Sequence, residues 1–196
     1  MTDNHQMASM SDTDILAAHQ FPTPLGTMLL IAAEEGLCLL EFVGSQRITR
    51  EQRDLERLTG RRTVFAENRH TRQTVIEIGE YFQGIRRRFD LELFTPGSPF
   101  QQQVWRALQD IPYGETRSYQ QQAEYLHHPS AIRAVAAANG ANRVSIVIPC
   151  HRVIGKNGNL TGYAGGLQRK QWLLEHEQGR QLHKHADLFD FDTPAS

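Results

Sequence analysis

The residue best suited to covalent chemistry in this sequence is Cys150, which is followed directly by His151 and Arg152. A free thiol has a pKa near ~8.5, so only a few per cent is the nucleophilic thiolate at neutral pH. A nearby imidazole or cation raises that fraction, or a base removes the proton as the sulfur attacks. Because adjacent side chains on a strand point in opposite directions, adjacency leaves open whether His151 contacts the thiol. We interpret Cys150 as a candidate nucleophile.

The second cysteine, Cys38, lies in the apolar run of residues 36–42 and is interpreted as a small buried hydrophobe. A disulfide between Cys38 and Cys150 is the alternative, which a reducing intracellular compartment disfavours. The histidines are scattered, and no convincing pair of zinc ligands appears. We therefore expect neither a metal nor another cofactor.

Composition and charge limit the class of protein. Hydrophobic residues make up 39% and charged residues 22% of the 196 residues, which is ordinary for a globular protein. No apolar run approaches the roughly 20 residues needed to cross a bilayer, and residues 1–14 lack a signal peptide's apolar stretch, so we expect a cytoplasmic protein without membrane contact. The net charge of −1 hides a balance of +3 over residues 95–179, a weak indication of nucleic-acid binding.

The elements that position Cys150 begin with a mixed α/β segment. Residues 27–32 and 37–43 read as two strands of a hairpin, and residues 46–58 as a surface helix or loop. Apolar side chains at helical spacing predict a helix over 71–82, and alternation over 89–93 predicts a half-buried strand. We expect residues 1–13 to be disordered and residues 14–94 to form an N-terminal α/β domain.

The turn-rich stretch from Thr95 to Pro99 is the predicted domain boundary. Beyond it, Ser98 is placed to cap a helix, and Ser118 begins a second helix with a capping box. A third, short helix is predicted from Pro129 to near Gly140, and residues 144–148 read as a buried strand or extended segment. We assign residues 95–179 to a C-terminal domain and 180–196 to a flexible tail.

The second and third helices suggest a helix-turn-helix, although two ordinary packed helices give the same pattern. The third helix is rich in alanine, and Arg133 is its only charged side chain. A narrow helix with one long cation can enter a DNA groove. The alternative is that the alanines permit close packing while Arg133 points to solvent.

The residues around Cys150 resemble a specific family. The run Pro149-Cys150-His151-Arg152-Val153 is similar to the signature of the O6-alkylguanine-DNA alkyltransferases, also called methylated-DNA–protein-cysteine methyltransferases. The resemblance is strong over residues 95–178 and looser before them. Further segments in the family order are residues 100–105, 114–115, 118–121, 133–135, 163–167 and 170–177.

This resemblance implies a relay of three residues. Cys150 would accept the alkyl group, His151 would act as its base through a water, and Glu177 would orient and polarise the histidine. Asn142 would brace the turn within the relay, although a helix C-cap or turn role is also open. Without the family, Glu177 would read as a solvated acid at a helix end.

The resemblance also implies residues that contact the substrate. Tyr119 would donate a hydrogen bond or proton to the departing guanine, and Arg133 would fill the gap left by the flipped base. The loop of residues 157–166 would line the base pocket, with small residues that leave room for substituents larger than methyl. The implied substrate-binding residues are Arg133, Val153, Tyr163, Ala164, Gly165 and Ser118.

The implied fold is a ribonuclease H-like α/β domain, with a small antiparallel sheet plus helix, followed by a mostly α, winged-helix-like domain. The implied function is irreversible, single-turnover transfer of an alkyl group from O6 of guanine, with O4 of thymine also open, in double-stranded DNA approached from the minor groove. A monomer, associated with the nucleoid through DNA, suits this reaction. Alternatives are a non-catalytic alkylguanine-binding protein, a cysteine hydrolase and a helix-turn-helix regulator.

Overall fold

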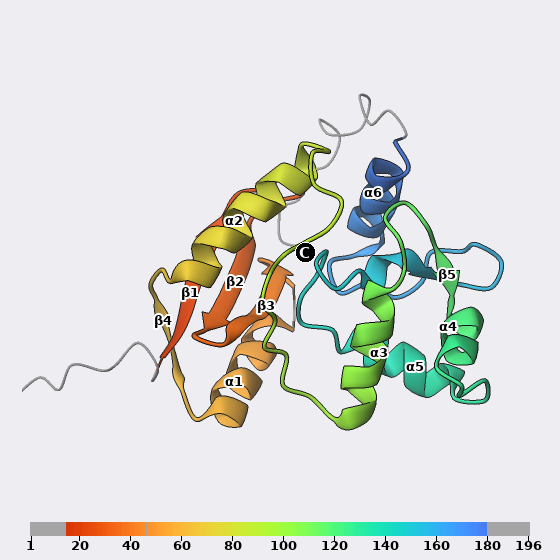
Figure 1. The fold of residues 1–196 in the computed structure, drawn as a ribbon, viewed down its shortest axis with the longest axis horizontal. Coiled ribbons are helices and arrows are strands. Elements are labelled where there is room, and N and C mark those ends of the chain that lie inside the picture. Colours follow the sequence, from red (N-terminus) through yellow and green to blue (C-terminus); the bar gives the residue numbers. More distant parts are fainter. Residues whose placement is uncertain (1–14, 46, 180–196) are drawn as a thin grey trace, which may run out of the picture.

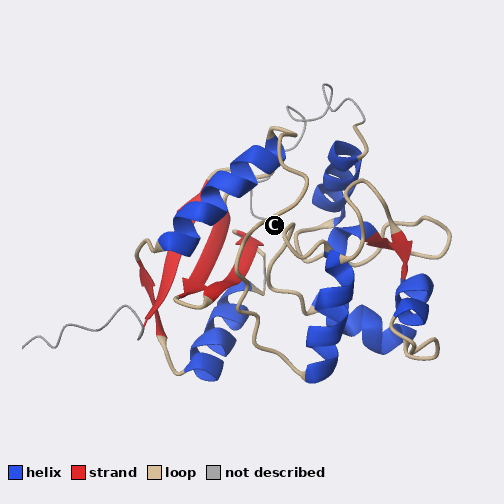
Figure 2. Ribbon diagram, in the orientation of Figure 1, coloured by secondary structure: helices blue, strands red, loops and turns tan. Residues whose placement is uncertain are grey.

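The computed structural model describes residues 15–45 and 47–179. Figure 1 shows two lobes, one coloured red to yellow in which helices flank a sheet, and one coloured green to blue and built mainly from helices. Figure 2 shows the same division, since the longer strands all lie in the first lobe. The predicted disordered start and flexible tail lie outside the described residues.

The first lobe holds a four-stranded sheet with the order β3-β2-β1-β4. Its strands are β1 (Ile15–Phe21), β2 (Met28–Ala33), β3 (Gly36–Phe42) and β4 (Arg62–Phe65). The predicted hairpin is confirmed, because β2 and β3 pair antiparallel. The expectation of an antiparallel sheet is corrected: β4 pairs parallel to β1, so the sheet is mixed. The crossover that a parallel neighbour requires is supplied by α1 (Ile48–Thr59).

Both faces of this sheet are covered by other elements. The expected fold placed one helix on the sheet, whereas in the structure two helices pack on it. Leu29 and Ile31 of β2 share an apolar cluster with Leu55 of α1. The alternate residues Met28 and Leu30 belong to the other face, which packs on α2 (Arg69–Phe82) and on the second lobe. Because successive strand residues point to opposite faces, the continuous apolar run of β2 requires cover on both sides.

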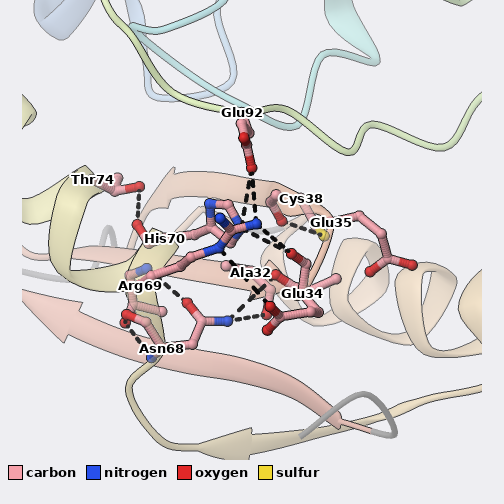
Figure 3. Close-up of polar contacts among 12 residues, drawn as sticks. Ala32, Glu34, Glu35, Cys38, Asn68, Arg69, His70, Thr74 and Glu92 are labelled. Carbon is pink, nitrogen blue, oxygen red and sulfur yellow. Dashed lines mark hydrogen bonds and ion pairs between the residues drawn. The ribbon is translucent and has the colours of Figure 1, made fainter.

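The start of α2 is fastened to the β2–β3 turn by polar contacts. Figure 3 shows Arg69 and His70 directed at Glu34 of that turn and at Glu92. His70 Nε2 lies 2.9 Å from the carbonyl oxygen of Glu34, and Arg69 Nη2 donates to Glu92 Oε2 at 3.1 Å. These contacts connect the helix, the hairpin turn and the chain that leads to the second lobe.

The prediction of a strand over residues 89–93 is wrong. This segment forms only an isolated parallel bridge, between Leu93 and Leu37. It crosses Gly36 so closely that a Cβ there would lie 2.6 Å from the Glu92 carbonyl oxygen. The alternating pattern correctly indicated a half-buried extended chain, but the segment leaves the sheet after one bridge and leads to the second lobe.

The second lobe begins with α3 (Pro99–Gln109), followed by α4 (Tyr119–Tyr125) and α5 (Ile132–Gly140). The predicted cap at Ser98 and the predicted capping box at Ser118 are confirmed, and each serine accepts a hydrogen bond from the third residue of its helix. The structure adds that Ser98 and Gln101 also form a capping box. The third helix begins at Ile132 rather than at Pro129, because residues 129 and 130 form a turn. The remaining elements are β5 (Arg117–Ser118), the 3-10 helix η2 (Cys150–Arg152), β6 (Val153–Ile154) and α6 (Leu167–Glu177).

Residues 144–148 form a buried turn, which corrects the predicted strand. Val144 makes one bridge to Leu40 of β3, and the Ile148 amide then donates back to the Val144 carbonyl at 3.0 Å. Ile146 has a φ of 72°, an unfavourable value for a β-branched residue. The apolar composition indicated burial correctly, but burial alone does not fix the backbone conformation.

Candidate active site

The Cys150 side chain is placed by the rigid turn that precedes it. Its amide donates to the Ile148 carbonyl at 2.8 Å, and it starts η2 directly after Pro149. The side chain is 7% exposed and forms part of the wall of a pocket of about 540 Å³. Cys38 is fully buried in the sheet, and both cysteines are free thiols, so the disulfide alternative is excluded.

The electrostatic surroundings keep Cys150 protonated at rest. Burial raises the pKa of its thiol, and a hydrogen bond from Asn142 together with the charges of Lys170 and Arg47 only partly offset that effect. The buried Glu41 raises the pKa of the thiol further. A nucleophilic sulfur at this position therefore needs a base that takes its proton.

His151, the residue after Cys150, forms a buried pair with Glu177. His151 Nε2 lies 2.8 Å from Glu177 Oε1, and both side chains are inaccessible to solvent. Burial lowers the pKa of His151, while Glu177 opposes the shift. Because a carboxylate can only accept, Nε2 carries the proton and Nδ1 is the bare nitrogen, with no hydrogen-bond partner in the described chain.

Glu177 accepts hydrogen bonds from four residues. Arg152 donates from Nε to Oε2 at 2.7 Å and from Nη2 to Oε1 at 3.0 Å. The Tyr81 hydroxyl donates to Oε1 at 2.9 Å, and the Gly114 amide donates to Oε2 at 3.2 Å. Burial alone would raise the pKa of Glu177, but His151 and Arg152 hold it well below its usual range. The carboxylate is therefore ionised and fixed in orientation.

Asn142 joins the end of α5 to the turn before Cys150. Its Nδ2 donates to the Ile148 carbonyl at 2.9 Å, and its Oδ1 accepts from the Val144 amide at 3.0 Å. The side chain is 2% exposed. It braces the turn of residues 144–148.

The pocket in front of Cys150 brings together residues from α4, α5 and the loop of residues 157–166. Of the residues predicted from the sequence, Tyr119, Arg133, Tyr163, Ala164 and Asn142 line it with Cys150. Burial raises the pKa of Tyr119, and the nearby Cys150 adds to this effect, so the phenol remains protonated. Thr161 and Gly162, from the loop of residues 157–166 that was expected to line the base pocket, also belong to its wall. Residues that were not predicted line it too: Arg47, Ile132, Ala136, Asn139 and Gly140.

Three predicted substrate-binding residues do not line this pocket. Val153 is fully buried, and its carbonyl accepts from Lys170 Nζ at 2.7 Å. Ser118 caps α4 and lies in β5, beside Ile154. Gly165 is packed so tightly that a Cβ would lie 2.8 Å from the Tyr163 ring and 2.9 Å from Phe42. Gly165 therefore allows the loop to pack on the first lobe.

Lys170 is a buried cation that joins two walls of the site. Its Nζ donates to the carbonyls of Val153 and Thr161, each at 2.7 Å. Burial lowers its pKa to about 8. Lys170 thus connects the chain after Cys150 to the loop of residues 157–166. The only signal for Lys170 in the sequence is its position in the segment 170–177, which resembles the family.

Arg47 is the pocket residue that comes from the first lobe. Its guanidinium donates to the carbonyls of Gly140 and Asn142, and its Nε lies 3.5 Å from Glu51 Oε1. Nothing in the sequence distinguishes Arg47 from the other arginines around α1. It was missed because its partners lie more than 90 positions away.

Among the described residues, no three or more His, Cys, Asp or Glu side chains cluster as metal ligands would. The helices in residues 15–45 and 47–179 include none with the length and apolar character needed to traverse a bilayer.

Comparison with known proteins identifies two family models. Residues 18–95 match the ribonuclease-like domain of 6-O-methylguanine DNA methyltransferase, and residues 99–179 match its DNA-binding domain. A methylated-DNA–protein-cysteine methyltransferase of Mycolicibacterium paratuberculosis is 54% identical over 132 residues, which is 67% of this chain and 78% of that protein. A protein of the same name from Methanosarcina acetivorans is 43% identical over 159 residues, 80% of this chain and 95% of that protein.

A solved structure gives the same result. The crystal structure of Mycobacterium tuberculosis OGT in complex with DNA matches with a TM-score of 0.72 and 38% identity, over 84% of this chain and 94% of that chain. With both domain models matched in order and a near-full-length relative at 43% identity, the chain belongs to the methylated-DNA–protein-cysteine methyltransferase family of DNA repair proteins.

Proposed function

We propose that Cys150 removes the alkyl group from O6 of guanine in double-stranded DNA and keeps it as a thioether. One observation supports this assignment above the others: a free thiol lies in the wall of a pocket, and the next residue in the chain, His151, is paired with the buried Glu177. The alternative of a non-catalytic alkylguanine-binding protein is not favoured, because the acceptor cysteine is present.

The proton of the thiol goes to His151 in this proposal. Nδ1 is the nitrogen able to accept it, directly or through a water, because Nε2 donates to Glu177. Glu177 stabilises the imidazolium that forms, as the carboxylate does in a catalytic triad. The sulfur then forms a bond to the alkyl carbon as the bond from that carbon to O6 breaks.

The departing guanine develops negative charge, which Tyr119 neutralises by donating a hydrogen bond or its proton. Its phenol is protonated and lines the same pocket as Cys150. A donor aimed at developing charge in a site shielded from water lowers the barrier to reaction. A thioether is stable in water, and none of the described residues that line the pocket is suited to remove the alkyl group, so in this proposal each molecule reacts once.

In this proposal α4 and α5 bind the duplex, and the alkylated base flips out of it into the pocket. Arg133 lies on α5 at the pocket, with its side chain exposed. We place α5 in the minor groove, where Arg133 occupies the gap left by the flipped base. Together with the short sheet β5-β6, these two helices would form a winged-helix-like DNA-binding unit. We further propose that the protein is a monomer, with residues 14–94 and 95–179 as its two domains. Ser118, Val153 and Gly165 do not line the pocket, and in this proposal they hold the elements around it in place.

Intact mass spectrometry tests the proposal. We expect the protein to gain one methyl group from duplex DNA carrying O6-methylguanine and one benzyl group from free O6-benzylguanine, since Gly162 and Ala164 leave the pocket wide. Cys150→Ala should gain neither, whereas the matched Cys38→Ala should react like the wild type. A folded wild-type protein that gains no methyl group would refute the proposed function.

A further inference from the structure

Tyr81 of the first lobe reaches the buried pair formed by His151 and Glu177. It lies on α2, is fully buried, and donates from its hydroxyl to Glu177 Oε1 at 2.9 Å. The same oxygen accepts from His151 Nε2 at 2.8 Å. A residue 96 positions from Glu177 therefore shares an oxygen atom with the histidine.

The position of Tyr81 is fixed at both ends by neighbouring residues of α6. Its backbone carbonyl lies 2.8 Å from His176 Nε2, while its hydroxyl bonds to the next residue, Glu177. The His176 ring packs on the Tyr81 ring with centroids 5.2 Å apart and stacks on Trp172 at 4.9 Å. The hydroxyl therefore has little freedom to move away from the carboxylate.

Tyr81 can serve only as a donor in this place. Burial, reinforced by the negative charge of Glu177, raises the pKa of its phenol well above the usual range. Its proton therefore stays on the oxygen and points at Glu177. A donor of this kind fixes the carboxylate and withdraws part of the negative charge that His151 feels.

We infer that Tyr81 is a positioning residue of the alkyl-transfer site, holding Glu177 Oε1 against His151 and limiting the charge which that oxygen presents to the imidazole. This inference rests on the proposed function. It gives the first lobe a part in the chemistry: α2 helps to keep His151 neutral and ready to accept the thiol proton.

The other groups that face His151 set the sign of the expected effect. They are Glu177 and Lys170 from α6, Arg152 from η2 and Tyr163 from the loop of residues 157–166. Tyr113 packs on Tyr81 with ring centroids 6.1 Å apart. Glu177 favours the imidazolium, and the cations oppose it. Removing the Tyr81 donor leaves more negative charge on Glu177, which raises the pKa of His151.

The test is the pH–rate profile of Tyr81→Phe, which keeps the buried ring and removes the hydroxyl. We expect the acid limb of the reaction with free O6-benzylguanine to move up by about 0.5 to 1 pH unit, because His151 must be neutral to act as base. The rate should therefore fall roughly threefold to tenfold on that limb and change less above it. Rate constants are taken from the fraction that reacts, so partial misfolding does not bias them.

Tyr113→Phe is the matched control. Burial and the negative charge of Glu177 raise the pKa of Tyr113, but Tyr113 is not one of the four residues that donate hydrogen bonds to that carboxylate. The pH–rate profile of Tyr113→Phe should match that of the wild type. A Tyr81→Phe protein whose acid limb coincides with that of the wild type would overturn the inference. Equal shifts in both variants would also overturn it. Wild-type protein that gains no methyl group from O6-methylguanine DNA would instead refute the proposed function, whatever Tyr81→Phe does.

Discussion

Glu177 receives from the protein the hydrogen bonds that a solvated acid would receive from water. Its two oxygens accept from Arg152, His151, Tyr81 and Gly114, and its side chain is inaccessible to solvent. A buried ion is stable only when paired and hydrogen-bonded, so each donor offsets part of the cost of removing the charge from water. The result is a carboxylate whose orientation is set from several directions.

Glu177→Gln should lower stability most at neutral pH. The folded-state pKa of Glu177 is depressed, so its contribution is present above the ordinary value of 4.5 and is lost as the pH falls through the folded pKa. Breaking a buried pair costs about 3–5 kcal/mol, so we expect a loss of that order at pH 7 and a smaller one below about pH 4. Urea unfolding at both pH values measures this difference.

Glu115→Gln is the control for the Glu177 experiment. It removes an exposed carboxylate from the same lobe, so it should change the free energy of unfolding by less than about 0.5 kcal/mol at either pH. A Glu177→Gln penalty that is the same at pH 7 and below pH 4 would show that the ionised carboxylate is not its source.

At the scale of elements, α4 and α5 are short helices that depend on their caps and neighbours. Ser118 and Gln121 form a reciprocal capping box at the start of α4. α5 has no side-chain cap, and its buried residues Val135 and Ala138 pack it into the lobe. Packing therefore holds α5 in place and leaves Arg133 exposed at the pocket rim.

Arg133→Ala should separate DNA delivery from chemistry. We expect the reaction with O6-methylguanine in duplex DNA to be slower by roughly tenfold or more. Without the arginine side chain nothing fills the gap in the duplex, so the flipped base returns to it more easily. The rate with free O6-benzylguanine should change little. Arg57→Ala, which removes an exposed arginine from α1, controls for the lost charge. Equal slowing of both reactions would argue against a role in base flipping.

At the scale of the whole molecule, the two lobes share one apolar core. Leu40 and Phe42 of the sheet cluster with Val144, Cys150 and Leu173 of the second lobe. Polar contacts reinforce this joint, since Arg143 donates to the Pro96 carbonyl at 2.7 Å and pairs with Glu51 of α1. Figure 1 shows the turn before η2 lying between the lobes. The position of Cys150 thus depends on the first lobe.

Arg143→Met should weaken this joint. We expect a loss of about 1–3 kcal/mol in unfolding free energy, because Glu51 loses a charged donor in a buried place, and slower benzyl transfer, because residue 143 anchors the turn before Cys150. Arg50→Met is the matched control, since Arg50 also approaches Glu51 but its side chain is 72% exposed. Similar losses in the two variants would show that the joint does not depend on Arg143.

Local patterns predicted much of this protein. The hairpin of β2 and β3, the helix α2, the cap of α3 and the capping box of α4 follow from apolar period and cap chemistry within a few residues. The same patterns failed for residues 89–93 and 144–148. Alternation and apolar composition report which side chains are buried, whereas strand pairing depends on a partner elsewhere in the chain.

The sequence by itself determined the candidate nucleophile, its neighbouring histidine and, through resemblance, the family with the residues Glu177, Tyr119 and Arg133. Only the tertiary structure decided how Glu177 is held, and that Tyr81, Arg47 and Lys170 take part in the site. Arg47 and Tyr81 contact residues more than 90 positions away. Such contacts leave no periodic trace in a sequence, because they arise where separate elements meet, and only the packing of the two lobes brings them together.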